Sequence, residues 1–265
     1  MDGNNLTKLM ASTRPDFSKL PGGWEPPFEQ IPILWGGLTG RIEHIRDFDG
    51  CLVYQALIPE DCQKLIQLMQ QSPNVEKVSV QGRKDVPDDR TGSIRTTIWA
   101  PQLALQIWRK IAHLIPPRNM NMLSATDWWQ GNKNRTKWNS VGISPMLRFM
   151  RYDAGGQHYA HYDAGYIYND DSTRTLQSIV IYLTTTDKGG ATRFICDGQK
   201  DLPIWSRNHL DWTREVLPKE VLFRSQPEQG KILIFDHRIC HDVELYQGNE
   251  PRIIIRGDLV FQAAV

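Results

Sequence analysis

The pattern of apolar and polar residues divides the chain into a helical part followed by a strand-rich part. Residues 58–71 have Pro59 at an early helical position, and residues 101–115 run as a second helix until two prolines end it. From Met146 onward, short apolar runs alternate with turn residues, which is typical of strands. The predicted strands are residues 51–57, 146–152, 158–163, 176–184, 191–195, 231–237 and 252–261. The order predicts an α+β fold in which helices buttress one face of an antiparallel sandwich or barrel.

The first 48 residues have a different texture, because they are rich in Pro, Gly and Trp and show no periodicity. We expect residues 1–48 to form an N-terminal extension that wraps a single catalytic domain of residues 49–265. Trp24, Phe28 and Trp35 suggest that part of the extension docks on that domain. The alternative is a partly disordered tail.

Composition limits the classes of function. The 265 residues carry a formal charge of +1, so the chain has no general electrostatic attraction to nucleic acid or to an anionic membrane. The sequence has neither a membrane-spanning apolar stretch nor a secretory signal pattern, and its four cysteines form no CxxC pair. We therefore expect a cytoplasmic protein without a disulfide framework or a zinc cluster.

Candidate chemistry begins in the stretch QHYAHYDAGYIYND, residues 157–170. In a strand, His161 and Asp163 project from the same face and His158 from the other. An imidazole beside a carboxylate is two thirds of a metal site. His241, which follows a late apolar strand, is the candidate for the third ligand, and His237 is its rival. Two histidines and one carboxylate are typical of a ferrous oxygenase with open coordination positions.

The last predicted strand adds a candidate anion site. Arg252, Ile254 and Arg256 share one of its faces, and two arginines on one face indicate a carboxylate-binding interior. Each assignment has a plainer alternative. The histidines could be ordinary strand or surface residues. Arg256 could pair with Asp258 or another acid, and Tyr152 could be a core residue.

Five segments in order resemble the prolyl-4-hydroxylase branch of the Fe(II)/2-oxoglutarate-dependent dioxygenases. They are RYDAGGQHYAHYD, RTLQSIVIYLT, GGATRF, GKILIFDHRICHDV and RIIIRGDLVF. The resemblance implies a double-stranded β-helix, or jelly-roll, core. It also implies that His161, Asp163 and His241 bind Fe(II), with 2-oxoglutarate and O2 as cosubstrates. Arg252 would pair with the distal carboxylate of 2-oxoglutarate and Tyr152 would donate a hydrogen bond to it, with Arg256 a further anion-binding candidate.

The chain departs from the family pattern at two positions. Ala191 stands where the family often has glutamate, and Arg252 stands where collagen-type members often have lysine. Both departures bear on the substrate more than on the activity.

The expected function is hydroxylation of an unactivated C–H bond of an amino-acid side chain, free or in a peptide, with release of succinate and CO2. The alternatives are an oxygenase acting on another small molecule or on a nucleic-acid base, and a catalytically silent binding module. Base-modifying members usually carry two arginines separated by five residues, whereas three residues separate Arg252 and Arg256. We expect an amino acid or a peptide as partner, and neither nucleic acid nor membrane.

The segment DWWQGNKNRTKWNS, residues 127–140, is expected to be a lid over the substrate. Trp128, Trp129 and Trp138 would supply apolar contact area. The alternative is that these tryptophans pack on the N-terminal extension and stabilise it.

Overall fold

A computed structural model gives the fold. The part of the chain that the structure describes comprises residues 14–35, 40–45, 48, 50–78, 93–115, 118–119, 137–168, 172–199, 202 and 215–264.

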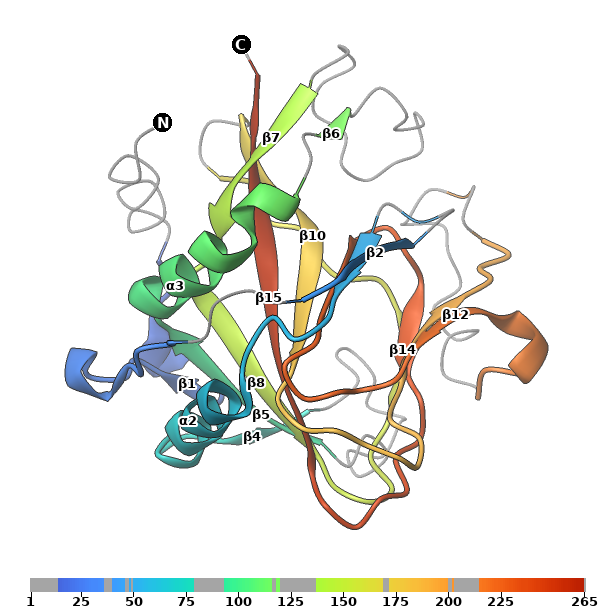
Figure 1. Cartoon of the computed structure of the whole chain (residues 1–265), viewed down its shortest axis with the longest axis horizontal. Helices are drawn as coiled ribbons and strands as arrows, with labels where there is room; N and C mark the ends of the chain where they lie inside the picture. Colours follow the sequence, from blue (N-terminus) through green and yellow to red (C-terminus); the bar gives the residue numbers. More distant parts are fainter. Residues whose placement is uncertain are drawn as a thin grey trace.

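Both predicted helices are present. The first, α2 (Pro59–Gln70), begins with a proline, has Glu60 and Asp61 in its first turn, and buries Leu65 and Leu68. The second, α3 (Pro101–Ile111), continues as a short 3₁₀ turn, Ala112–Leu114. Their apolar faces belong to one large core together with residues of the sheet that they cover. Figure 1 shows α2 and α3 on one side of that sheet and β12 and β14 on the other.

The strands of the described residues form two sheets. The large sheet has the order β1-β5-β8-β15-β10-β13-β3-β2, with β4, β6 and β7 attached, and the small sheet has the order β12-β11-β14-β9. The large sheet contains β1 (Gly23–Trp24), β2 (Ile42–Ile45), β3 (Gly50–Val53), β4 (Glu76–Lys77), β5 (Ser93–Trp99), β6 (Arg118–Asn119), β7 (Lys137–Ile143), β8 (Met146–Tyr152), β10 (Thr173–Tyr182), β13 (Ile232–Asp236) and β15 (Arg252–Ala263). The small sheet contains β9 (His158–His161), β11 (Thr192–Ile195), β12 (Val221–Ser225) and β14 (His241–Val243).

The eight strands from β8 to β15 follow the path of a jelly roll. The chain passes from β8 in the large sheet to β9 in the small one, returns to β10, crosses to β11 and β12, returns to β13, crosses to β14 and ends in β15. Neighbouring strands of this set are antiparallel. The predicted α+β class with a double-stranded β-helix core is confirmed.

Alternation along the strands of the large sheet separates two cores. On β15, Ile253 and Ile255 pack with the helices, whereas Ile254 packs with Phe194 and Val243 of the small sheet. The face of β15 that carries Ile254 therefore points into the space between the two sheets. By the same alternation, Arg252 and Arg256 point inward as well.

The N-terminal segment joins the domain in part. Trp24 lies in β1, which pairs in parallel with β5. The N–H of the buried Leu34 donates a hydrogen bond to Oε1 of Gln106 in α3 at 2.9 Å. The side chains of Phe28 and Trp35 are 72% and 73% exposed, although the N–H of Trp35 donates to the carboxylate of Asp61 in α2 at 3.0 Å. The boundary at residue 48 stays a prediction.

Several strands differ from those predicted. The strand expected over residues 51–57 ends at Val53, because Gln55 adopts φ 51° and turns the chain. The strand expected over residues 158–163 ends at His161, and β5, β7, β12 and β14 were not predicted. In the described residues, the four cysteines are free thiols, and no helix has the length and apolar character to cross a membrane.

Candidate metal and cosubstrate site

Two of the predicted ligands are direct cross-strand neighbours. His161 of β9 and His241 of β14 are paired in register, and their ring centres lie 4.2 Å apart. The Nδ1 atom of His161 lies 2.7 Å from the carbonyl oxygen of Tyr159, and that of His241 lies 3.0 Å from the carbonyl oxygen of Ile239. Because a carbonyl oxygen only accepts, each Nδ1 carries the proton and donates it. Each Nε2 is then a free ligand atom.

Asp163 completes the group from a position two residues beyond the end of β9. Its carboxylate oxygens lie 4.0 Å from Nε2 of His161 and 3.6 Å from Nε2 of His241. One ligand atom from each of the three residues fits within a mutual distance of 4.8 Å. The structure therefore brings together the three residues that the sequence indicated as ligands.

The carboxylate of Asp163 is held by two side chains of the large sheet. Nη2 of Arg256 lies 3.1 Å from one carboxylate oxygen, and the hydroxyl of Ser178 donates a hydrogen bond to the other. Burial would raise the pKa of Asp163, but Arg256, with His241 and His161, holds that pKa well below its usual value. Burial lowers the pKa of His241 to about 3. At neutral pH the site thus offers an anionic carboxylate and a neutral imidazole, which fits a divalent first-row metal such as Fe(II).

His158 does not point away from the other histidines, so that prediction is wrong. Its ring stacks on that of His161 with the centres 4.2 Å apart. The reason is a β-bulge: His241 pairs with His161 and Val243 with His158, so two residues of β9 face one residue of β14. The extra residue breaks the alternation and brings His158 to the same face as His161.

His237, the rival of His241, lies elsewhere. It is fully buried, and its Nε2 lies 3.1 Å from a carboxylate oxygen of Asp258. Since it does not belong to the three-residue group, the geometry favours His241 as the third ligand.

Arg252 lies buried beside two tyrosines. Its Nε donates to the carbonyl oxygen of Gly190 at 2.6 Å, and its guanidinium carbon lies 4.6 Å from the ring centre of Tyr152 and 6.0 Å from that of Tyr182. Its Nη1 is buried without a hydrogen-bond partner in the described structure. A buried guanidinium with an unsatisfied N–H group fits a carboxylate ligand, as 2-oxoglutarate would supply.

Tyr152 lies directly opposite Arg252 on the neighbouring strand, and it is 1% exposed. Its hydroxyl lies 3.8 Å from the sulfur of Met150. Tyr152 thus packs against Arg252 as a core residue, and its hydroxyl can serve a ligand bound beside that arginine.

Arg256 binds two acids, so the ion pair considered from sequence is present. Besides Asp163, its guanidinium contacts both carboxylate oxygens of Asp258, at 2.9 and 3.1 Å. Arg148 contacts the same carboxylate at 3.2 Å. Sequence reasoning missed Ser178 and Arg148. Arg148 lies four residues before Tyr152 and therefore on the same strand face, a signal that alternation alone could have provided.

Residues 127–136 of the predicted lid, including Trp128 and Trp129, lie outside the described residues. Trp138 is 3% exposed in β7, packs in the core beneath the helices, and has the guanidinium of Arg174 5.3 Å from its ring centre. Trp138 is therefore a core residue, and the prediction that it contacts the substrate is wrong.

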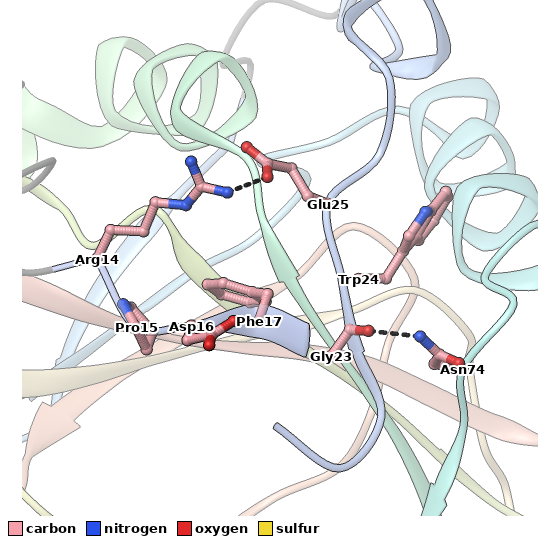
Figure 2. A pocket seen from close by; sticks show the side chains of 8 residues that line it. All are labelled: Arg14, Pro15, Asp16, Phe17, Gly23, Trp24, Glu25 and Asn74. Carbon is pink, nitrogen blue, oxygen red and sulfur yellow. Dashed lines mark hydrogen bonds and ion pairs between the residues drawn. The ribbon is translucent and has the colours of Figure 1, made fainter. Parts of the chain in front are cut away.

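A hollow of about 680 Å³ lies at β1 (Figure 2). It is lined by residues 14–17, 23–25 and Asn74. Its polar groups already bind one another: Arg14 pairs with Glu25, and Asn74 donates to the carbonyl oxygen of Gly23 at 2.8 Å. It contains none of the candidate ligands.

Comparison with known proteins agrees with the motifs. The family model described as the 2OG-Fe(II) oxygenase superfamily matches residues 147–257, which include His161, Asp163, His241, Arg252 and Arg256. The resemblance stated from the sequence is thereby confirmed. A comparison with curated proteins gave no match.

Similar solved structures include three with low identity. A viral collagen prolyl hydroxylase from Paramecium Bursaria Chlorella virus-1 is 15% identical, with 83% of this chain and 97% of that chain covered and a TM-score of 0.44. A prolyl-4-hydroxylase from Pseudomonas putida is 13% identical, with 80% and 93% covered and a TM-score of 0.45. A prolyl hydroxylase from Trichoplax adhaerens, in complex with a peptide, is 14% identical, with 80% and 84% covered and a TM-score of 0.47. Likeness at this level does not indicate a substrate for this chain.

Proposed function

We propose that this enzyme, which uses Fe(II), 2-oxoglutarate and O2 and whose residues 147–257 match the 2OG-Fe(II) oxygenase superfamily, hydroxylates an amino-acid side chain. The substrate is a free amino acid or a residue in a peptide, and the bond attacked is an unactivated C–H bond. The observation that carries this proposal is the convergence of His161, Asp163 and His241, with their ligand atoms within 4.8 Å of one another.

In this proposal, the three residues would hold Fe(II), with 2-oxoglutarate and O2 as cosubstrates. The chemistry that bound iron supplies is O2 activation coupled to decarboxylation of 2-oxoglutarate, which yields succinate, CO2 and a hydroxylated substrate. The protein's part is orientation. The backbone acceptors of Tyr159 and Ile239 direct both Nε2 atoms inward, and Arg256 with Ser178 fixes the Asp163 carboxylate.

Arg252 is proposed to bind the distal carboxylate of 2-oxoglutarate. Its unsatisfied Nη1 supports this role, and the Tyr152 ring holds the guanidinium in place. Arg256 is assigned to Asp163 instead of to the cosubstrate, because two acids already occupy its guanidinium.

The remaining parts of the proposal concern partners and organisation. The substrate is an amino acid or a peptide, without nucleic acid or membrane. Residues 1–48 are an extension of the catalytic domain of residues 49–265.

The test is a turnover screen. The purified protein, with Fe(II) and 2-oxoglutarate in air, is incubated with free amino acids, short peptides and cell extract, and succinate is measured together with the substrate product. We expect slow succinate formation alone and a marked increase with the correct substrate, whose mass rises by one oxygen atom. Succinate without any oxygenated product would contradict hydroxylation. A protein that neither binds Fe(II) nor forms succinate would be a silent binding module.

A further inference from the structure

A cationic cluster beside the proposed metal site is not used by the function described above. Arg148 lies on β8 in alternation with Met150 and Tyr152, both of which pack between the two sheets. Arg95 on β5 is paired in register with Met150. Both arginines therefore project from the inner face of the large sheet, the face that also carries Arg256.

Contacts place this cluster next to the proposed ligands. Arg148 lies 3.2 Å from Asp258, Asp258 lies 2.9 Å from Arg256, and Arg256 lies 3.1 Å from Asp163.

The acids in contact with the three arginines are shared unevenly. Arg95 pairs with Glu76, whereas Arg148 and Arg256 share the single carboxylate of Asp258. Asp163, which also contacts Arg256, makes three acids against three arginines. As the proposed metal ligand it would also have to balance the charge of Fe(II), so binding of the metal would leave a surplus positive charge on the inner face. Burial and Arg256 both lower the pKa of Arg148, as expected for a guanidinium short of negative partners.

The two arginines are also partly accessible, unlike the cosubstrate arginine. The side chains of Arg148 and Arg95 are 21% and 26% exposed, whereas Arg252 is fully buried. Arg148 is engaged at one terminal nitrogen by a carboxylate that Arg256 and His237 also contact. A guanidinium with accessible N–H groups beside a reaction centre is suited to bidentate binding of a carboxylate.

We propose that Arg148, assisted by Arg95, binds a carboxylate group of the substrate. The inference rests on the proposed function and narrows it: the substrate carries a free carboxylate near the carbon that is oxidised, as a free amino acid does. An uncharged residue inside a peptide does not meet this requirement.

The experiment compares acids with their amides. The proteinogenic L-amino acids and the corresponding L-amino-acid amides are screened as substrates by succinate and product formation. They are also screened as ligands by the thermal shift of the anaerobic protein loaded with Fe(II) and 2-oxoglutarate. We expect at least one acid to exceed its amide about tenfold or more in kcat/KM, the usual effect of losing a charge-assisted hydrogen bond. Arg148→Ala should remove that preference and Arg148→Lys should restore part of it.

The matched control is Arg151→Ala. Arg151 lies on the same strand as Arg148, but its side chain projects from the other face of the sheet, and its ion pair with Asp153 is exposed. The Arg151→Ala variant should leave the acid-to-amide ratio unchanged. Arg95→Gln is a second variant that reduces the ratio without disturbing Asp258.

The outcomes separate the two proposals. If no acid is preferred over its amide in either measurement, or if Arg148→Ala keeps the wild-type ratio in a folded protein, the carboxylate subsite is wrong while hydroxylation can stand. If the wild-type protein forms no succinate under any condition, the proposed function itself fails. In that case, the thermal shifts alone test whether the protein binds an acid in preference to its amide.

Discussion

Tyr152 and Arg252 face each other across the β8–β15 pair, with the guanidinium carbon 4.6 Å from the ring centre. The contact holds the arginine by its flat face, and the carbonyl oxygen of Gly190 holds it at Nε. Its Nη1 is left for a ligand. The buried arginine is therefore oriented before any cosubstrate arrives, which reduces the entropy lost on binding.

Removing Arg252 should weaken the binding of 2-oxoglutarate without weakening the binding of Fe(II). In Arg252→Ala, a buried carboxylate loses its charged partner, a change of about 2–5 kcal/mol. The KM for 2-oxoglutarate should rise at least about thirtyfold, while Fe(II) affinity changes little. Titration of 2-oxoglutarate by succinate release measures the first quantity and anaerobic calorimetry with Fe(II) the second. An unchanged KM here, with a raised KM in Arg256→Ala, would move the role to Arg256.

The absence of a side chain at Gly190 leaves room for the side chain of Arg252. A Cβ at Gly190 would lie 2.9 Å from Cδ of Arg252, and the residue adopts φ +72°. Gly190→Ala should raise the KM for 2-oxoglutarate and lower the melting temperature. Gly155→Ala is the matched control, because Gly155 also has a positive φ but no atom within 4 Å of the added Cβ. It should lower stability through backbone strain alone. Equal effects of the two variants on KM would contradict the steric explanation.

The metal ligands can be told apart from the nearby histidine by spectroscopy. With anaerobic Fe(II) and 2-oxoglutarate, the wild-type protein should show a weak visible charge-transfer band. His161→Ala or His241→Ala should abolish it, since each removes one of three ligands. His237→Ala should retain the band, because His237 contacts Asp258 and not the ligand group. Loss of the band in His237→Ala but not in His241→Ala would reverse the assignment of the third ligand.

Asp258 should govern acid stability. Burial would raise its pKa, but Arg256, His237 and Arg148 lower it to about 2 from an ordinary 3.8. Because the folded pKa is the lower one, the stabilisation is fully present above about pH 4 and is lost as the pH falls through about 2. It amounts to roughly 2 kcal/mol.

Urea unfolding of the metal-free protein between pH 2 and pH 6 measures this contribution. Asp258→Asn should be less stable at pH 6 and should depend less on pH between 4 and 2. Asp153→Asn, which removes an exposed partner of Arg151, should behave like the wild type. A wild-type slope in Asp258→Asn would mean that other carboxylates cause the acid unfolding.

The tryptophans of residues 127–140 should separate into two classes. Trp138→Ala empties a buried site and should destabilise the fold by about 3–5 kcal/mol, seen as a lower melting temperature. The double variant Trp128→Ala/Trp129→Ala should lower coupled hydroxylation while melting temperature and uncoupled decarboxylation stay near wild type, as the sequence-based lid hypothesis requires. A lowered melting temperature in the double variant, with both activities reduced together, would assign these tryptophans to the structure instead.

Sequence pattern and motif order were sufficient to predict the barrel and the ligand group. His161, Asp163 and His241 converge as the family resemblance implied, and the inward facing of Arg252 and Arg256 followed from strict alternation on β15. The same rule failed at His158, because a β-bulge arises from the pairing of two strands and cannot be predicted from the sequence of one strand.

Other features depended on the partner that each side chain finds in three dimensions. Trp138 appeared to be a lid residue because aromatic residues clustered in sequence, yet it lies in β7 against the core. Ser178 sits in a strand buried along its whole length, where nothing local distinguishes a serine that donates to a metal ligand from one that fills space.

The hold on Asp163 from Arg256 and Ser178 has a mechanical consequence. Asp163 extends from the small sheet, whereas Arg256 and Ser178 belong to the large sheet, so this carboxylate ties the two walls of the barrel together. An ion bound to the same carboxylate and to both histidines would join three ligands of the small sheet and fix Asp163 in the position in which it meets Arg256 and Ser178. By mass action, an ion at a hundred times its dissociation constant adds about 2.7 kcal/mol to the unfolding free energy. The melting temperature is thereby a direct gauge of metal occupancy, readable in the absence of oxygen and of any substrate.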